Sequence, residues 1–164
     1  MTYYSLFVID LASRRVHFAG PTRHPDDAFM RQVARDLTAP MDGFVRGHRV
    51  LICDRDSKWS DGFRQMFEEV GVRVVQTPYR APNCNAHAER FVRSIKEECL
   101  HRVIPLGEHH LRHAIDEFVI HYHRERNHQG IGNELIDGKP LVQTGDVGCR
   151  QRLGGFLRYY HRAA

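Results

Sequence analysis

The sequence predicts an α/β protein in which strands and helices alternate. Three observations lead to this prediction. Aromatic and β-branched runs of strand length alternate with segments whose apolar residues recur every three or four positions. The run "HRVLICD", residues 48–54, is short and almost wholly apolar, as expected of a strand buried on both faces in the middle of a sheet. A chain of 164 residues is long enough for one domain with a substantial core.

The first elements predict a hairpin followed by a helix. "YYSLFVID" (3–10) is rich in strand-forming residues, and "RRVHFAG" (14–20) alternates well enough to be its partner across the turn-like "LAS". "HPDDAFMRQVARDL" (24–37) has an acidic first turn and apolar residues at a spacing of four, which predicts a helix.

The central elements continue the alternation. After the apolar strand at 48–54, "SDGFRQMFEEVG" (60–71) predicts a helix that Ser60 caps and Gly71 ends. "VRVVQTP" (72–78) predicts a further strand, so that the order is β-β-α-β-α-β.

Two more helices and a tail complete the prediction. "AHAERFVRSIKEECLHRVI" (86–104) and "EHHLRHAIDEFVIHYHRERN" (108–127) both have amphipathic spacing. Residues 136–164 show little periodicity and end in a basic run, so we expect a basic C-terminal tail or docking arm after a core at 1–135.

Composition narrows the class of protein. No apolar run approaches a membrane span and no signal-peptide pattern begins the chain, so we expect a cytoplasmic protein with no membrane partner. The four cysteines form no CxxC pair, which argues against a disulfide scaffold or a zinc finger. The net charge is +4 and arginine dominates the basic residues, which makes nucleic acid a plausible partner.

Two carboxylates stand where a metal ion would bind. Asp54 ends the apolar strand, and Glu89 lies in the first turn of the helix at 86–104. Ligands of open α/β sheets bind outside the carboxyl ends of the strands, and carboxylate oxygens are natural ligands of Mg²⁺ or Mn²⁺. The structural alternative is that Asp54 caps a loop and that Glu89 forms a surface salt bridge.

The surroundings of these carboxylates resemble a known family. "CDRDSKW" (53–59), "TPYRAPNCNAHAERFVRSIKEECL" (77–100) and "HYHRERNHQGIG" (121–132) are similar to the catalytic core of DDE integrases and transposases, particularly the bacterial insertion-sequence transposases related to retroviral integrase. The resemblance runs from about Tyr4 to Gly132. It implies an RNase H-like fold with a mixed central sheet flanked by helices, DNA as partner, and no small-molecule cofactor.

The resemblance also assigns residues. Asp54 and Glu89 would be the second and third acidic residues of a triad that binds two divalent ions for DNA cleavage and strand transfer. Basic residues near the catalytic helix or at the end of the core would contact DNA, and here they are Arg90, Arg93, Lys96, Arg124 and Arg126. The alternative for Arg93 and Lys96 is pairing with Glu89 and Glu97 along the helix. A structural cap is the alternative for the cluster around Arg124.

The first acidic residue of the family pattern is missing from this sequence. It is commonly found as Asp-x-x-Thr on the first strand of the core, whereas "LFVIDLASRR" (6–15) matches the second strand. The sheet is therefore expected to lack the family's first strand, and the core to be incomplete at its N-terminus. Asp10 is a candidate third carboxylate, but it is better explained as a turn residue that accepts backbone N–H groups and pairs with Arg14 or Arg15.

Three functions are therefore open. The first is an integrase or transposase core with a weakened two-ion site and impaired catalysis, working as a homodimer. The second is a non-catalytic remnant that binds DNA or a partner transposase. The third is an RNase H-like nuclease that hydrolyses without integrating.

Overall fold

The computed structural model describes residues 2–80, 82–138 and 144–162. The chain divides into two compact units, one made of Met1–Phe7 with Ala19–Glu89 and the other of Val8–Phe18 with Arg90–Ala164. Among the described residues, no helix is long and apolar enough to cross a membrane.

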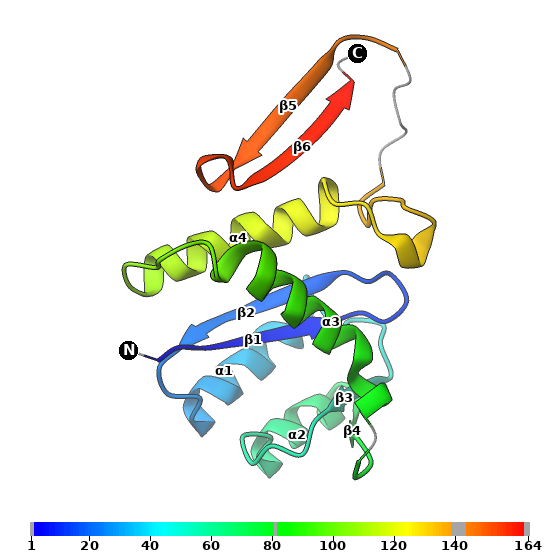
Figure 1. Ribbon diagram of the computed structural model, residues 1–164. Helices are drawn as coiled ribbons and strands as arrows, with labels where there is room; N and C mark the ends of the chain where they lie inside the picture. The colour runs from blue at the N-terminus through cyan, green and yellow to red at the C-terminus, as the bar shows by residue number, and fades with distance from the viewer. Residues whose placement is uncertain (1, 81, 139–143, 163–164) are drawn as a thin grey trace. The chain divides into compact units, whose positions relative to one another are not determined.

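The N-terminal hairpin and the first helix form as predicted. Strands β1 (Tyr4–Ile9) and β2 (Val16–Thr22) pair in a two-stranded sheet (Figure 1). Helix α1 (Asp27–Leu37) begins where Asp26 accepts a hydrogen bond from the backbone N–H of Phe29, at 2.9 Å.

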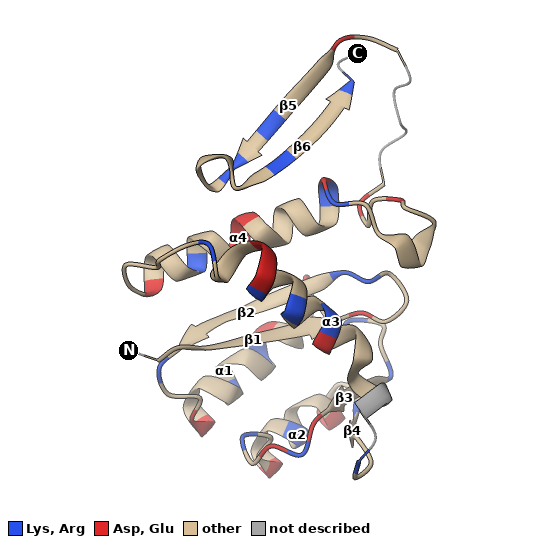
Figure 2. Ribbon diagram, in the orientation of Figure 1, with Lys and Arg blue, Asp and Glu red and all other residues tan. Residues whose placement is uncertain are grey.

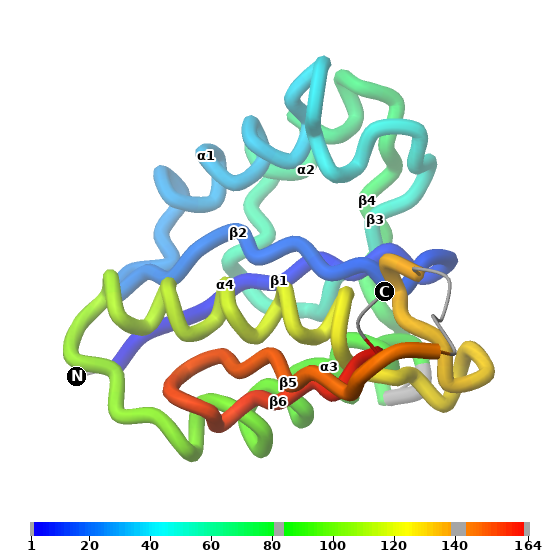
Figure 3. The backbone as a smooth tube through the Cα atoms, turned by 90° about the horizontal axis from the view of Figure 1, so that it is seen from above, coloured from blue at the N-terminus to red at the C-terminus, as the bar shows by residue number. Residues whose placement is uncertain are grey.

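The predicted cap and stop of the second helix are also confirmed. Helix α2 (Asp61–Glu69) begins after Ser60, whose hydroxyl accepts the N–H of Phe63 at 3.3 Å. Gly71 follows the helix with a φ of +79°, a conformation that glycine adopts without strain. Helices α1 and α2 pack together (Figure 3), and their buried side chains are Met30, Val33, Ala34, Leu37, Phe63 and Phe67.

The apolar strand differs from its prediction. Strand β3 (Val50–Cys53) pairs in parallel with β4 (Arg73–Gln76), and these two strands form a sheet of their own among the described residues. Val50 and Ile52 are each 42% exposed, so the expectation of a strand buried on both faces is wrong. The physical reason is that Val50 and Ile52 share one face of β3 that stays open to solvent, whereas Cys53 on the opposite face is buried.

The sheets as a whole follow the same pattern. The described residues form three two-stranded sheets: β1–β2, β3–β4, and β5 (Val147–Arg152) with β6 (Leu157–Arg162). The chain is therefore α/β as predicted, but no single mixed central sheet is present among these residues.

The helix predicted at 86–104 is shorter than expected. Helix α3 (Ala86–Ile95) continues into a π-helical turn, Lys96–Leu100, and no helix extends to Ile104. The wide turn places the thiol of Cys99 3.6 Å from the carbonyl oxygen of Ala114, in the buried contact with the next helix. Local packing therefore replaces regular α-helical geometry at this point.

Helix α4 (Glu108–Arg124) carries the core of the second unit. The rings of Phe91 and Tyr122 meet edge to face at 5.0 Å, and Phe118 lies against both. These aromatic contacts join α3 to α4 through side chains that are almost fully buried.

The C-terminal segment, predicted as a basic tail or docking arm, contains a hairpin. Strands β5 (Val147–Arg152) and β6 (Leu157–Arg162) pair antiparallel. Positions 139–143 and 163–164 of that segment lie outside the described residues. The predicted domain boundary after residue 135 stays a prediction.

Candidate functional site

Asp54 lies directly after β3, at the carboxyl end of the parallel β3–β4 pair. Its Oδ1 atom accepts the backbone N–H of Asp56 at 3.2 Å and the indole Nε1–H of Trp59 at 2.5 Å. The side chain is otherwise exposed. The loop thus fixes one carboxylate oxygen and leaves Oδ2 for a ligand.

Trp59 orients the Asp54 side chain, and this contact was not predicted from the sequence. Its ring packs against that of Phe63 at 5.2 Å, and Phe63 is fully buried against Phe67. The indole therefore connects Asp54 to the core of α2. The sequence did contain a signal for this contact, because Trp59 follows Asp54 by five residues and a loop of that length can bring the two side chains together.

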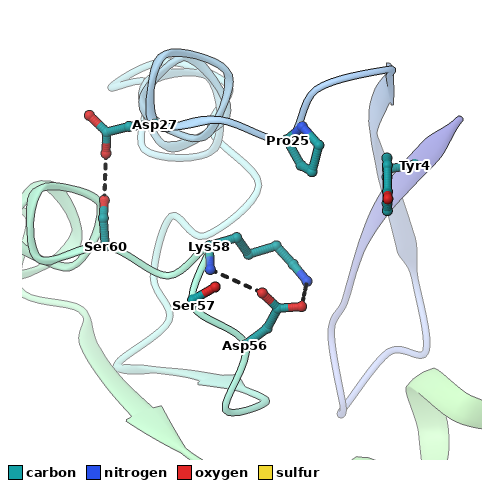
Figure 4. Close-up of a pocket in the computed structure, with 7 residues that line it drawn as sticks. All are labelled: Tyr4, Pro25, Asp27, Asp56, Ser57, Lys58 and Ser60. Atoms are coloured by element: carbon teal, nitrogen blue, oxygen red, sulfur yellow. Dashed lines mark hydrogen bonds and ion pairs between the residues drawn. The ribbon is translucent and has the colours of Figure 1, made fainter.

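A pocket of about 430 Å³ lies beside this loop (Figure 4). Its acidic groups are already partnered. Lys58 donates to Asp56 from both its backbone N–H and its ammonium group, and Ser60 donates to Asp27 at 2.6 Å. These hydrogen bonds hold the pKa of Asp56 and of Asp27 below the usual range, with Arg31 also donating to Asp27. Neither Asp54 nor Glu89 lines the pocket.

Glu89 lies in the first turn of α3, where the helix dipole favours a negative charge. Its side chain is exposed and has no ion-pair partner in the part of the chain that the structure describes. Asp54 and Glu89 belong to the same compact unit. Among the described residues, however, no group of three histidine, cysteine, aspartate or glutamate side chains is arranged to hold a metal ion.

Two of the predicted DNA contacts on and just after α3 are solvent-exposed cations. Arg93 lies on α3 and Lys96 opens the π-helical turn. No ion pair joins either to a carboxylate within the described ranges. The alternative of helix-surface pairing with Glu89 and Glu97 is therefore not found. Arg90, on the same helix, is also exposed.

Arg124 and Arg126 have different surroundings. Arg126 makes a two-pronged pair with Glu98, with distances of 3.0 and 2.8 Å, and this hydrogen bonding raises the pKa of the guanidinium. Arg124 is exposed and lies 3.4 Å from a carboxylate oxygen of Asp137. Arg126 is thus held within the fold, whereas Arg124 is largely free to meet a ligand.

A buried acid lies at the end of α4. The carboxylate of Glu125, 1% exposed, accepts hydrogen bonds from Arg152 at 2.9 and 2.7 Å and lies 3.1 Å from Nδ1 of His121. Burial alone would raise the pKa of Glu125, but the hydrogen bonds from Arg152 and His121 outweigh it and lower the pKa to about 2. Arg152 also donates to Glu117 at 3.0 Å. This network is structural, because its acid is hidden from any ligand.

A neutral histidine lies next to this network in the sequence. Nε2 of His123 accepts the backbone N–H of Val16 at 2.9 Å. Burial lowers the pKa of His123 to about 4, so the ring is uncharged at neutral pH.

Asp10 stabilises a turn, as its structural interpretation predicts. Its carboxylate accepts the backbone N–H of Ala12 at 2.9 Å and the hydroxyl of Ser13 at 2.5 Å. Arg15 bonds instead to Asp137. A role for Asp10 as a metal ligand stays a prediction.

One family model matches part of the sequence. Residues 70–134 match the family model for the integrase core domain. This segment is similar to integrase core domains. The match confirms the resemblance and includes Glu89 together with the cations from Arg90 to Arg126, but it does not extend to Asp54. A comparison with curated proteins finds no significant match.

The match indicates a general class of activity. Integrase core domains act in DNA integration, bind DNA and generally use divalent metal ions. Glu89 lies within the matched segment and Asp54 lies outside it, and the roles of both carboxylates stay predictions.

Proposed function

We propose that the chain is a DNA strand-transfer protein whose divalent-metal site is built on Asp54 and Glu89. The observation that carries the proposal is the exposed carboxylate of Glu89, which lies inside the integrase core segment and has no ion-pair partner among the described residues. The RNase H-like arrangement belongs to the same proposal.

The donor set suits a hard cation. Oδ2 of Asp54 and the carboxylate of Glu89 offer oxygen ligands, which Mg²⁺ and Mn²⁺ prefer. When bound, such an ion would activate a water or hydroxyl nucleophile and stabilise the leaving oxygen of a phosphodiester. Trp59 keeps Asp54 oriented. Arg93 and Lys96, which follow Glu89 along the chain, would bind DNA phosphates.

The proposed site is weak. Two carboxylates without a third ligand hold a divalent ion loosely, so we expect dissociation constants of about 1 mM. Catalysis should therefore be slow and should require high metal concentration.

Nicking of supercoiled plasmid by the full chain tests the proposal. Nicking in Mn²⁺ should disappear in Asp54→Asn and Glu89→Gln and persist in the controls Asp42→Asn and Glu69→Gln, which change exposed acids elsewhere in the same unit. Calorimetric titration with Mn²⁺ gives a second readout, in which the first two variants should lose the binding heat. Equal nicking and equal Mn²⁺ binding in all five proteins would refute the assignment.

A second function is favoured by one observation. Because no group of three ligating side chains is found in the described parts of the chain, a protein that binds DNA or another transposase without catalysis is the competing candidate. DNA binding that persists in EDTA and in both variants, with no nicking in Mn²⁺, would support it.

A further inference from the structure

The β5–β6 hairpin has two faces of different character. Side chains alternate between the faces of a strand, and the register pairs Arg152 with Leu157 and Cys149 with Tyr160. One face therefore carries Leu157, Tyr159 and His161 of β6, and the other carries Arg158, Tyr160 and Arg162. We call the second set the Arg-Tyr-Arg row.

The first face is anchored to α4. Leu157 is buried, and Arg152 on the same face bonds to Glu117 and to the buried Glu125. Tyr159 stacks on His161 with the rings 6° from parallel. These contacts fix the orientation of the hairpin within its unit, so that the opposite face points to solvent.

The Arg-Tyr-Arg row is exposed and cationic. Tyr160 is 62% exposed, and Arg158 and Arg162 are exposed on either side of it. Each arginine donates to one neutral backbone oxygen, that of Gly155 or of Gly145, and neither pairs with a carboxylate within the described residues. Figure 2 shows basic positions and no acidic one on β5 and β6. Each arginine of the row thus has guanidinium N–H groups that can bind a ligand, and no described carboxylate forms an ion pair with either.

The spacing of the row suits a single nucleic-acid strand. Residues two apart on a strand are separated by about 6.6 Å, so the two arginines stand about 13 Å apart with the ring between them. Guanidinium groups bind phosphate oxygens through paired donors, and an exposed aromatic ring stacks on a base. The order Arg, Tyr, Arg along β6 therefore matches the order phosphate, base, phosphate along a single nucleic-acid strand.

We propose that the Arg-Tyr-Arg row binds one DNA strand, with Arg158 and Arg162 on its phosphates and Tyr160 stacked on a base. The inference rests on the proposed function, which makes DNA the partner. It assigns the C-terminal hairpin a site separate from Asp54 and Glu89.

Fluorescence anisotropy with the full chain tests the site. The probes are a labelled oligothymidylate of about 20 nucleotides and a duplex of the same length. Arg158→Ala with Arg162→Ala should weaken binding of the single strand about tenfold and lower the slope of log affinity against log salt by about 1.4. Tyr160→Ala should weaken it at least about fivefold without changing the slope, and Tyr160→Phe should restore it.

The matched control removes the same charge elsewhere. Within the described residues, the exposed Arg35 and Arg46 bond to neutral oxygens of Gln32 and Met41 and to no carboxylate, as the row arginines do with their own neutral partners. Arg35→Ala with Arg46→Ala should change the affinity less than twofold. All substituted residues are exposed, and unchanged melting temperatures will show that the variants are folded.

The outcomes separate the two proposals. If the wild-type chain binds DNA and the row variants bind it equally well, the hairpin site is wrong and the proposed function stands. If the wild-type chain binds neither probe, both are wrong. Loss of duplex and single-strand binding to the same extent, with no effect of Tyr160→Ala, would overturn the single-strand assignment. Displacement of the oligonucleotide by equimolar polyglutamate would show an acidic peptide site instead.

Discussion

The indole N–H of Trp59 donates a 2.5 Å hydrogen bond to Oδ1 of Asp54. The same ring lies on the buried Phe63, so the orientation of an exposed carboxylate depends on the core of α2. Lys58 adds a cation 5.5 Å from the centre of that ring. The orientation of the candidate metal ligand is thus set within one short loop.

Trp59→Phe separates orientation from packing. Phenylalanine keeps an aromatic ring near Phe63 but has no donor for Asp54, so the carboxylate should rotate freely. We expect a loss of stability of about 1 kcal/mol and a fall in Mn²⁺ affinity of about tenfold. Urea unfolding and calorimetric titration measure the two effects. Unchanged Mn²⁺ affinity would show that the hydrogen bond does not prepare Asp54 for a metal.

Glu125→Gln tests the buried network at the end of α4. The substitution leaves Arg152 without its main counter-charge, so the free energy of unfolding should fall by about 3 kcal/mol. Glu117→Gln is the graded comparison, because Glu117 is partly exposed and takes one of the bonds from Arg152. That variant should lose about 1 kcal/mol. Equal losses measured by urea unfolding would contradict the assignment of Glu125 as the centre of the network.

Because His123 is buried, we expect the free energy of unfolding to fall in mild acid. The pKa of His123 is about 4 in the folded chain, below the ordinary value of 6.5. Between these two pH values, His123 is therefore protonated in the unfolded chain and neutral in the folded chain. This contribution to stability is complete above pH 6.5 and is lost as the pH falls towards 4, by about 3 kcal/mol in total.

Unfolding by urea at pH 7, 5.5 and 4.5 measures this loss. His123→Gln should be less stable at pH 7 but should have a flatter dependence on pH, because its side chain does not titrate. The exposed His109→Gln should retain the wild-type slope. A slope in His123→Gln as steep as the wild type would assign the acid sensitivity to other groups.

The basic residues of the integrase core segment should divide into two classes. Arg93→Gln with Lys96→Gln should weaken DNA binding about tenfold with little change in stability, since both side chains are exposed. Arg126→Gln should instead lower stability by about 1–2 kcal/mol, because Glu98 loses its two-pronged partner. Melting curves and anisotropy on the same proteins check the division. A variant of Arg126 that melts normally would place this residue with the DNA contacts.

Local signals in the sequence predicted much of the fold. Ser60 and Gly71 bound α2 because a cap and a left-handed stop depend only on neighbouring residues. The number of partners of β3 could not be predicted, since an apolar run looks the same with one neighbouring strand or two. The π-helical turn could not be predicted either, because its residues make contacts with distant parts of the chain. Cys99 contacts α4, and Glu98 pairs with Arg126.

The hairpin and the site were predicted less completely. The sequence of β6 does alternate between the two faces of the hairpin. The pattern was missed because the strands are short and the glycines Gly154 and Gly155 interrupt them. Asp54 and Glu89 could be named from their places at a strand end and a helix start. The hydrogen bond from Trp59 could not, because loop conformation decides whether residues five apart meet.

The β3–β4 ribbon affects how the protein must be handled. Among the described residues, β3 has one edge without a strand partner, and its side chains Val50 and Ile52 are exposed. The free edge and the apolar side chains together offer a pairing surface to an extended segment of another chain. Concentrated or heated samples should therefore form aggregates rich in intermolecular strands before the helices melt completely. Placing a lysine at position 52 would discourage that association, and the soluble yield on expression would report it directly.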